Sequence, residues 1–284
     1  MDQNTDLKTR FDNQGFVVLR GLLEPAETAR YKAALEKLSA GRSQKWTIPD
    51  GVCRHPEFWD VLFNEKILAA VQSLLGAGYK FLQHNDLHVG FSSFHWHRDS
   101  VCRNYGKGPD WDESEAPYRL LRVGMYLQES SGGFRLGLVG GTHKPGQQPG
   151  DREQASLERQ SGMLAKALTL VGGKDHLADR AEWVQTGPGD CILFDPRVMH
   201  TGSDFQGDKY SLFTAYGIEN SHFYNHYNYY RYLRSDLGYQ ALHPALVERL
   251  RAAQLYAGEK NTVDRIEGAW LPSKTFVAVA RHFK

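Results

Sequence analysis

The hydrophobic pattern near the start of the chain predicts a short strand followed by helices. The run GFVVLRGLL is typical of a buried strand. The run EPAETARYKAALEKLSAG has the helical period, with Pro25 near its start and Gly41 beyond its end. The next segment, PEFWDVLFNEKILAAVQSLLGAG, predicts one or two helices closed by glycine. Together these elements predict a helical N-terminal flank over about residues 1–78.

From Tyr79 onward the pattern changes to short β-prone runs separated by Gly, Pro and Asp. These runs are YKFLQHNDLHVGF, YRLLRVGMYLQ, GGFRLGLVGG, AEWVQTGPGDCILFDP and YSLFTAYGIE. Their spacing is typical of an antiparallel sandwich or jelly roll. We therefore expect a mainly β fold with flanking helices. Its core, over about residues 79–220, is predicted to be a double-stranded β-helix of the jelly-roll or cupin-like kind.

The remaining segments predict loops and a C-terminal extension. The polar stretches RNYGKGPDWDESEAP and HKPGQQPGDREQASLERQSG predict loops or lids, and the second half of the latter is compatible with a helix. About residues 221–284 form an aromatic-rich segment that we expect to be helical or lid-like. It contains the run SHFYNHYNYYRYLR and a predicted helix in HPALVERLRAAQLYAG. We assign this aromatic run to packing of a lid or to a subunit contact, because few cations are interleaved with it.

Composition limits the classes of function. A chain of 284 residues that is 41% hydrophobic can bury one large core, so we expect a single domain over residues 1–284. The formal net charge of +1 gives no bulk electrostatic reason to expect a nucleic acid or a membrane as partner. Three widely spaced cysteines favour a reducing compartment, and no run approaches the ~18 apolar residues of a membrane span. We expect a cytoplasmic protein, monomeric or homodimeric, that acts on a small molecule.

The run SSFHWHRDS concentrates residues that carry chemistry. On a strand, which has a period of two, His95, His97 and Asp99 share one face, while Trp96 and Arg98 share the other. A histidine and an aspartate two residues apart on one face can occupy adjacent positions on an octahedral metal.

The segment GPGDCILFDPRVMHTGS supplies the third candidate ligand, His200. It consists of a turn, an apolar strand and a second turn before the histidine. The long separation from Asp99 fits a Greek-key return across a rolled sheet. His97, Asp99 and His200 are thus predicted to form a triad of two histidines and one carboxylate, which leaves three metal positions open.

These blocks carry a family resemblance. WHRD, GDCILFDPRVMHTGSD and KYSLFTAYG resemble the metal-binding and cosubstrate-anchoring blocks of the phytanoyl-CoA dioxygenase family. NQGFVVLRGLLEPAETARYKAALEKL and SGGFRLGLVGGTHK are also similar to that family, so the resemblance covers roughly residues 10–220. A single HxD tripeptide is a weak signal, but five blocks in the family's order are specific.

The resemblance implies a non-haem Fe(II) enzyme that uses 2-oxoglutarate and O2 and converts 2-oxoglutarate to succinate and CO2. The family usually anchors the distal carboxylate of the cosubstrate with an arginine in an RxS pattern. Here the pattern contains Lys209 and Ser211, and lysine supplies the charge without the bidentate fork. Gln83 is a further candidate to touch the cosubstrate. A solvated lysine at a strand end is the alternative interpretation of Lys209.

Other residues are candidates for the substrate pocket. His95 is expected to line it or to be structural, and Arg122, Tyr126 and Gln128 alternate on one predicted strand. The acidic loop after Asp99 favours a cationic or amine-bearing metabolite. An acyl-CoA substrate is not favoured, because no concentrated basic patch is present to bind its phosphates.

Asp99 decides between related reactions. The halogenases that resemble this family lack the carboxylate ligand, so the aspartate favours hydroxylation. The sequence does not separate hydroxylation from desaturation, ring closure or epoxidation. Three other classes remain open: a cupin-like metalloenzyme that does not use 2-oxoglutarate, a halogenase-like variant, against which Asp99 is the evidence, and a catalytically inactive binding domain of the same fold.

Overall fold

The computed structural model describes residues 3–41, 45–93, 95–129, 133–145, 177–259 and 265–272. Within these ranges, nine strands form two antiparallel sheets. The larger sheet has the order β1-β7-β4-β9-β3-β2. Its strands are β1 (Phe16–Leu19), β2 (Trp46–Pro49), β3 (Lys80–Val89), β4 (Leu120–Tyr126), β7 (Cys191–Phe194) and β9 (Tyr210–Gly217).

The smaller sheet has the order β6-β5-β8. It consists of β5 (Arg135–Val139), β6 (Glu182–Gln185) and β8 (Met199–Gly202). Buried side chains from both sheets, among them Tyr126, Leu136, Leu138, Ile192 and Phe194, form one apolar cluster. The two sheets therefore pack face to face, and the predicted jelly-roll core with flanking helices is confirmed.

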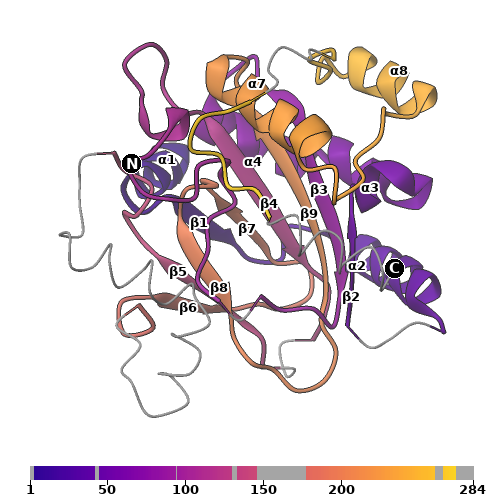
Figure 1. The fold of residues 1–284 in the computed structure, drawn as a ribbon. Helices are drawn as coiled ribbons and strands as arrows, with labels where there is room; N and C mark the ends of the chain where they lie inside the picture. Colours follow the sequence, from indigo (N-terminus) through magenta and orange to yellow (C-terminus); the bar gives the residue numbers. More distant parts are fainter. Residues whose placement is uncertain are drawn as a thin grey trace.

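Helices pack against the larger sheet and form a second apolar cluster with it. The helices are α1 (Gln3–Gln14), α2 (Pro25–Ser39), α3 (Gly51–Arg54), α4 (Glu65–Leu75), α7 (Ser221–Asn228) and α8 (Pro244–Ala252), with 3₁₀ segments at Pro56–Phe63 (η1) and Pro109–Trp111 (η2) and a π-helical turn at Tyr229–Leu233 (η4). Figure 1 shows α2 and α3 beside strands β2 and β3, away from the smaller sheet. Tyr31 and Leu35 of α2 share an apolar cluster with Val71 of α4 and with Leu121 and Val123 of β4.

Strand β4 shows how the fold divides its residues between the two layers. Leu121, Val123 and Met125 belong to the cluster under the helices, whereas Tyr126 belongs to the cluster between the sheets. Alternate side chains on a strand point to opposite faces, so Arg122 must share the inter-sheet face with Tyr126. A buried arginine at that position, 4% exposed, requires partners inside the molecule.

Several elements differ from the sequence-based expectations. Helix α1 and strand β2 were not predicted, because α1 is mostly polar and β2 is a short strand without a fully buried residue. The run around His97 is not a regular strand but a single antiparallel bridge between His97 and His200. The predicted helix in the second half of HKPGQQPGDREQASLERQSG lies outside the described residues. In the described part of the chain, no helix has both the length and the apolar character needed to cross a membrane.

Candidate metal centre and its cavity

Two segments that are distant in sequence bring the three predicted metal ligands together. His97 follows β3 in a loop, and its backbone exchanges two hydrogen bonds of 3.0 Å with that of His200 on β8. The backbone N–H of Asp99 donates to the carbonyl of Pro196 at 2.8 Å, which ties the loop to the turn before β8. The three side chains are therefore positioned by backbone hydrogen bonds and not by side-chain contacts alone.

The ligand atoms face a common point. The candidate ligand atoms of His97, Asp99 and His200 all lie within 4.8 Å of one another. The Nε2 atoms of His97 and His200 are each 3.8 Å from a different oxygen of Asp99. Each imidazole has its Nδ1 2.9 Å from a backbone carbonyl, that of His95 or of Val198. These bonds select the tautomer with hydrogen on Nδ1, so both Nε2 lone pairs are free to bind a metal.

Electrostatics keep each candidate ligand in its metal-binding form. Burial lowers the pKa of His97 and of His200, and the imidazoles are neutral at physiological pH. Burial by itself would raise the pKa of Asp99, but the polar and charged groups around it, of which the guanidinium of Arg122 has the largest effect, outweigh burial. The pKa of Asp99 therefore lies well below its usual range, and the group is a carboxylate.

Arg122 fixes the carboxylate of Asp99. Its Nη1 donates to Asp99 Oδ2 at 2.7 Å and lies 2.8 Å from His84 Nε2, while its Nη2 donates to Asp86 Oδ2 at 2.7 Å. The side chain is 5% exposed, so these charges interact in a largely dry environment. Arg122 thus joins β4 to β3 and to the loop that carries the candidate metal ligands.

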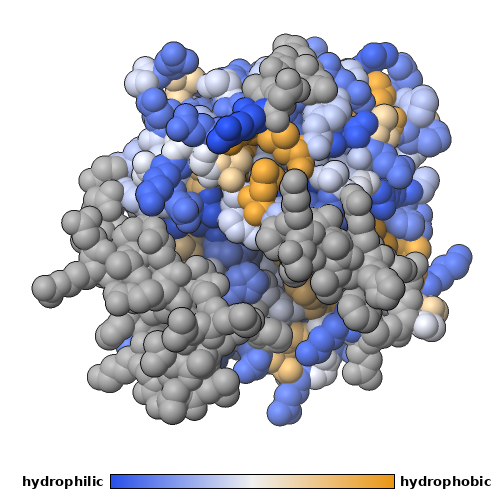
Figure 2. Space-filling view, in the orientation of Figure 1, coloured by the Kyte–Doolittle hydropathy of each residue, from blue (hydrophilic) through white to orange (hydrophobic). Residues whose placement is uncertain are grey.

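A cavity of about 310 Å³ opens onto this cluster. His97, Asp99 and His200 are in its wall, together with the aromatic rings of Phe134 and Phe213. Figure 2 shows that this face of the molecule is hollowed near its centre, with hydrophilic residues visible in the recess and hydrophobic residues along its upper edge. The volume is at the lower end of the range for small-molecule sites.

The buried amine of Lys209 projects into the same cavity. The residue is 3% exposed, and its Nζ donates to the carbonyl of Phe91 at 2.5 Å and lies 4.4 Å from the ring centroid of Phe134. Among the described residues no carboxylate pairs with it, and burial lowers its pKa to about 7. Ser211 follows one strand period later on β9, and its buried Oγ has no hydrogen-bond partner in the described structure. Ser211 shares a strand face with Lys209 and Phe213, which line the cavity, but Ser211 itself is not among the lining residues.

The other predicted pocket residues divide into two groups. His95 and Tyr126 line the cavity, and the buried hydroxyl of Tyr126 has no hydrogen-bond partner among the described residues. Gln128 does not line it: its amide N–H donates to Thr186 and its amide oxygen accepts from the backbone of Tyr210.

Gln83 is also outside the cavity, contrary to the expectation that it touches the cosubstrate. The cavity-lining residues of β3 are His84, Asp86 and His88, and Gln83 has the opposite parity on that strand. Its amide donates to Asp50 instead, at 3.1 Å. The overlooked signal was the alternation along β3: Gln83 faces the side of the strand opposite to His84 and His88.

Sequence reasoning also missed a histidine–tyrosine stack behind the candidate ligands. The rings of His84 and Tyr230 are stacked with centroids 3.6 Å apart, and His84 Nδ1 is 2.8 Å from His226 Nε2. The hydroxyl of Tyr230 donates to the carbonyl of Asp99 at 3.2 Å. The aromatic run near residue 230 therefore supports the loop of the site, and its unusual density of Tyr and His was the available signal.

The acidic loop after Asp99 has a structural role, which contradicts the argument for a cationic substrate. Asp110 is fully buried and accepts from the backbone of Cys102, and Glu113 forms a 2.6 Å ion pair with Arg197. None of the acidic residues of that loop lines the cavity. Sequence proximity to Asp99 was misleading because the loop turns its carboxylates away from the site.

Comparison with known proteins yields a family and a set of similar folds. The family model described as phytanoyl-CoA dioxygenase matches residues 11–210. No curated protein gives a significant sequence match.

Solved structures with a similar fold include HygX from Streptomyces hygroscopicus, crystallised with nickel and 2-oxoglutarate. It is 19% identical, with a TM-score of 0.56, over 77% of this chain and 87% of HygX. The non-haem α-ketoglutarate-dependent epimerase SnoN from nogalamycin biosynthesis is 15% identical, with a TM-score of 0.53, over 76% of this chain and 80% of SnoN. The carbocyclase SnoK from the same biosynthesis is 16% identical, with a TM-score of 0.53, over 76% of this chain and 85% of SnoK. At these identities the similarity establishes the fold.

Proposed function

Because the chain belongs to the phytanoyl-CoA dioxygenase family, we propose that it is an Fe(II)- and 2-oxoglutarate-dependent oxygenase that hydroxylates a small-molecule metabolite. One observation carries the proposal: the cavity that presents His97, Asp99 and His200 also contains the buried amine of Lys209, for which the described residues provide no carboxylate. A metal triad alone would fit many metalloenzymes. A second site for an anion in the same cavity fits a dicarboxylate cosubstrate.

The donor set suits Fe(II). Two neutral imidazoles and one carboxylate are hard and intermediate ligands that leave coordination positions open. His97 and His200 are oriented by the backbone carbonyls that accept from their Nδ1 atoms, and Asp99 is oriented by Arg122. When bound, Fe(II) and 2-oxoglutarate supply the oxidising chemistry, with succinate and CO2 as products and O2 as the oxidant.

Lys209 and Ser211 would hold the distal carboxylate of 2-oxoglutarate. The ammonium group provides charge and a hydrogen bond, and the Ser211 hydroxyl provides a second donor. An anion here would offset the cost of burying Lys209, which the carbonyl of Phe91 offsets only in part. Lysine is a point charge, so the anchor would be less directional than an arginine fork.

Hydroxylation is the reaction that the triad favours within this family. Asp99 would occupy the metal position that a halogenase needs for a halide. The similar folds of SnoN and SnoK belong to an epimerase and a carbocyclase of natural-product biosynthesis, so a natural product is a reasonable substrate class. The competing candidates are a cupin-like metalloenzyme without 2-oxoglutarate and an inactive binding domain.

A screen of metabolite extracts with mass detection tests the proposed reaction. The protein is supplied with Fe(II), 2-oxoglutarate and O2, and succinate release is measured beside the change in metabolite mass. We expect the substrate to gain one oxygen atom and succinate to form in equal amount, whereas Asp99→Ala should form neither. A product that has lost two hydrogens would indicate ring closure, and a product of unchanged mass would indicate epimerisation. Either result would contradict hydroxylation. Metabolite conversion without succinate would contradict the use of 2-oxoglutarate.

A further inference from the structure

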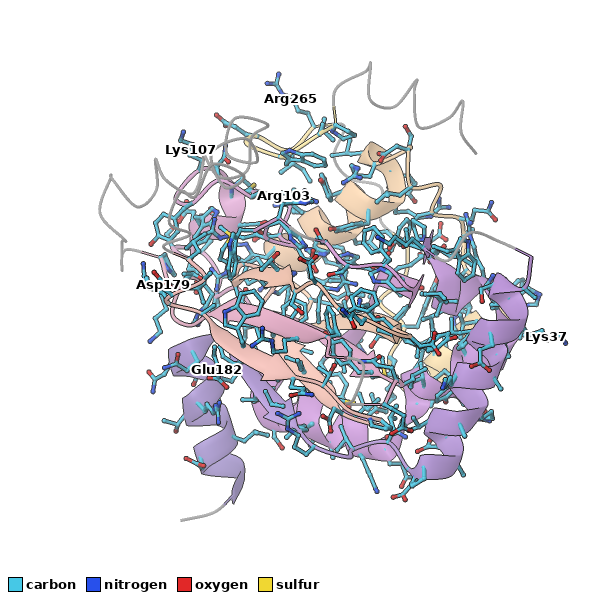
Figure 3. The ribbon with its side chains drawn as sticks, turned by 90° about the horizontal axis from the view of Figure 1, so that it is seen from below. Lys37, Arg103, Lys107, Asp179, Glu182 and Arg265 are labelled. Carbon is cyan, nitrogen blue, oxygen red and sulfur yellow. The ribbon has the colours of Figure 1, made fainter. Side chains whose placement is uncertain are left out.

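Arg103 is a cation at the cavity wall for which the described structure provides no carboxylate. It lies in the loop after the candidate metal ligands and lines the cavity. Its Nε is buried and has no hydrogen-bond partner among the described residues. Figure 3 shows Arg103 near the C-terminal segment and inward of Lys107 and Arg265, which both point away from the molecule.

The position of Arg103 is held from two sides. Its guanidinium carbon lies 4.0 Å from the ring centroid of Trp270, within the distance of a cation–π contact. Its backbone carbonyl accepts from Nη1 of Arg98, which is 2% exposed. Trp270 is tied in turn by a backbone hydrogen bond to the carbonyl of Val101. Within the described structure, these contacts orient the guanidinium without hydrogen bonds from its own donors.

Among the described residues, every other arginine or lysine of the cavity wall has a partner or a proposed ligand. Arg122 pairs with Asp86 and Asp99. Arg234 forms two hydrogen bonds of 2.7 and 2.8 Å with Asp236.

Among the described residues of the cavity wall, cofactor binding would leave the positive charge of Arg103 uncompensated. The distal carboxylate of 2-oxoglutarate would neutralise Lys209. Fe(II) would be neutralised by Asp99 together with the second carboxylate of the cosubstrate. One positive charge, that of Arg103, then remains in the cavity wall, and a partly buried cation without a counter-charge is costly.

We propose that Arg103 binds an oxyanion group of the substrate, either a carboxylate or a phosphate, and so selects anionic metabolites. The proposal rests on the function proposed above. A guanidinium with free donors matches the planar geometry of a carboxylate and the oxygens of a phosphate. The aromatic side chains of Phe134, Phe194 and Phe213 in the same wall would contact the apolar body of such a molecule.

Calorimetric titration with simple aromatic probes tests this assignment. The protein is first loaded with Ni(II), which does not turn over, and with 2-oxoglutarate. Benzoate, phenyl phosphate, neutral benzamide and cationic benzylamine are then titrated separately. We expect at least one of the two anionic probes to bind about tenfold more tightly than benzamide. The comparison of benzoate with phenyl phosphate distinguishes the two sources of the oxyanion.

Substitutions of Arg103 test whether this residue causes the preference for anionic probes. Arg103→Gln should abolish the preference for the anionic probe and leave the affinity for 2-oxoglutarate unchanged. Arg103→Lys should retain part of the preference. Arg251→Gln is the matched control, because Arg251 is an exposed arginine of α8 that pairs with Glu248 and is absent from the cavity wall.

The contrary outcomes are distinct. Equal affinity for anionic and neutral probes, whether both bind or neither binds, overturns the proposal, as does preferential binding of benzylamine. A preference that persists in Arg103→Gln also overturns it. A loss of 2-oxoglutarate affinity in Arg103→Gln would assign Arg103 to the cosubstrate instead. Failure of wild-type protein to bind 2-oxoglutarate at the loading step would overturn the proposed function itself.

Discussion

The side chains of the candidate metal centre are oriented by very local rules. His97 and His200 each place Nδ1 against the carbonyl of the residue two positions earlier, so each backbone segment orients its own imidazole. From the sequence, the period of two placed His97 and Asp99 on one face, and the turn, strand and turn before His200 supplied the third residue. The contact between Arg122 and Asp99 could not be predicted in this way, because it depends on how β4 lies relative to a distant loop.

Lys209 should couple cosubstrate binding to proton uptake. Burial lowers its pKa to about 7, so at about pH 8 most of the free protein carries a neutral amine. A bound carboxylate favours the charged form and raises this pKa, so 2-oxoglutarate binding should take up close to one proton per site. Calorimetry of Ni(II)-loaded protein in two buffers with different heats of ionisation measures this uptake.

Lys209→Arg is the control for that measurement. Arginine stays charged at every accessible pH, so the variant should bind 2-oxoglutarate without the proton uptake. If wild type and variant take up the same number of protons, another group titrates and Lys209 is not the anchor.

Strand β4 connects the candidate metal loop to the larger sheet through one side chain. Arg122 contacts Asp86 on the sheet and Asp99 on the loop, and all three side chains are less than one fifth exposed. Its burial was predictable from the alternation on β4, but its two carboxylate partners were not. Gln83 illustrates the same limit, because its assignment to the cavity failed through the parity of β3.

Arg122→Met should destabilise the metal-free protein. The substitution retains most of the side-chain volume but leaves two buried carboxylates without their cation. We expect a loss of about 3–5 kcal/mol in the free energy of unfolding, measured by urea denaturation. The double variant Arg122→Met with Asp86→Asn should lose less, because one of the uncompensated charges is removed. A single variant within about 1 kcal/mol of wild type would show that the Arg122 cluster does not stabilise the fold.

In the molecule as a whole, some elements of the jelly roll could be predicted from the sequence and others could not. The strand runs and the helices α2 and α4 have clear periodicity and glycine or proline signals, and they were predicted. The polar helix α1 has a weak pattern and was missed. The role of the C-terminal segment was not predictable either, because Tyr230 and Trp270 contact the site only after the whole chain has folded around it.

The most direct test of the proposed centre is anaerobic titration of the protein with Fe(II) and 2-oxoglutarate, followed by visible absorption. Chelation of Fe(II) by a keto acid produces a weak charge-transfer band, which neither component gives alone. We expect the band to appear with a stoichiometry of one per chain, to vanish in Asp99→Ala, and to require much more 2-oxoglutarate in Lys209→Ala. Absence of the band when Fe(II) is bound would contradict the 2-oxoglutarate-dependent function and favour a metalloenzyme of the same fold that works without this cosubstrate.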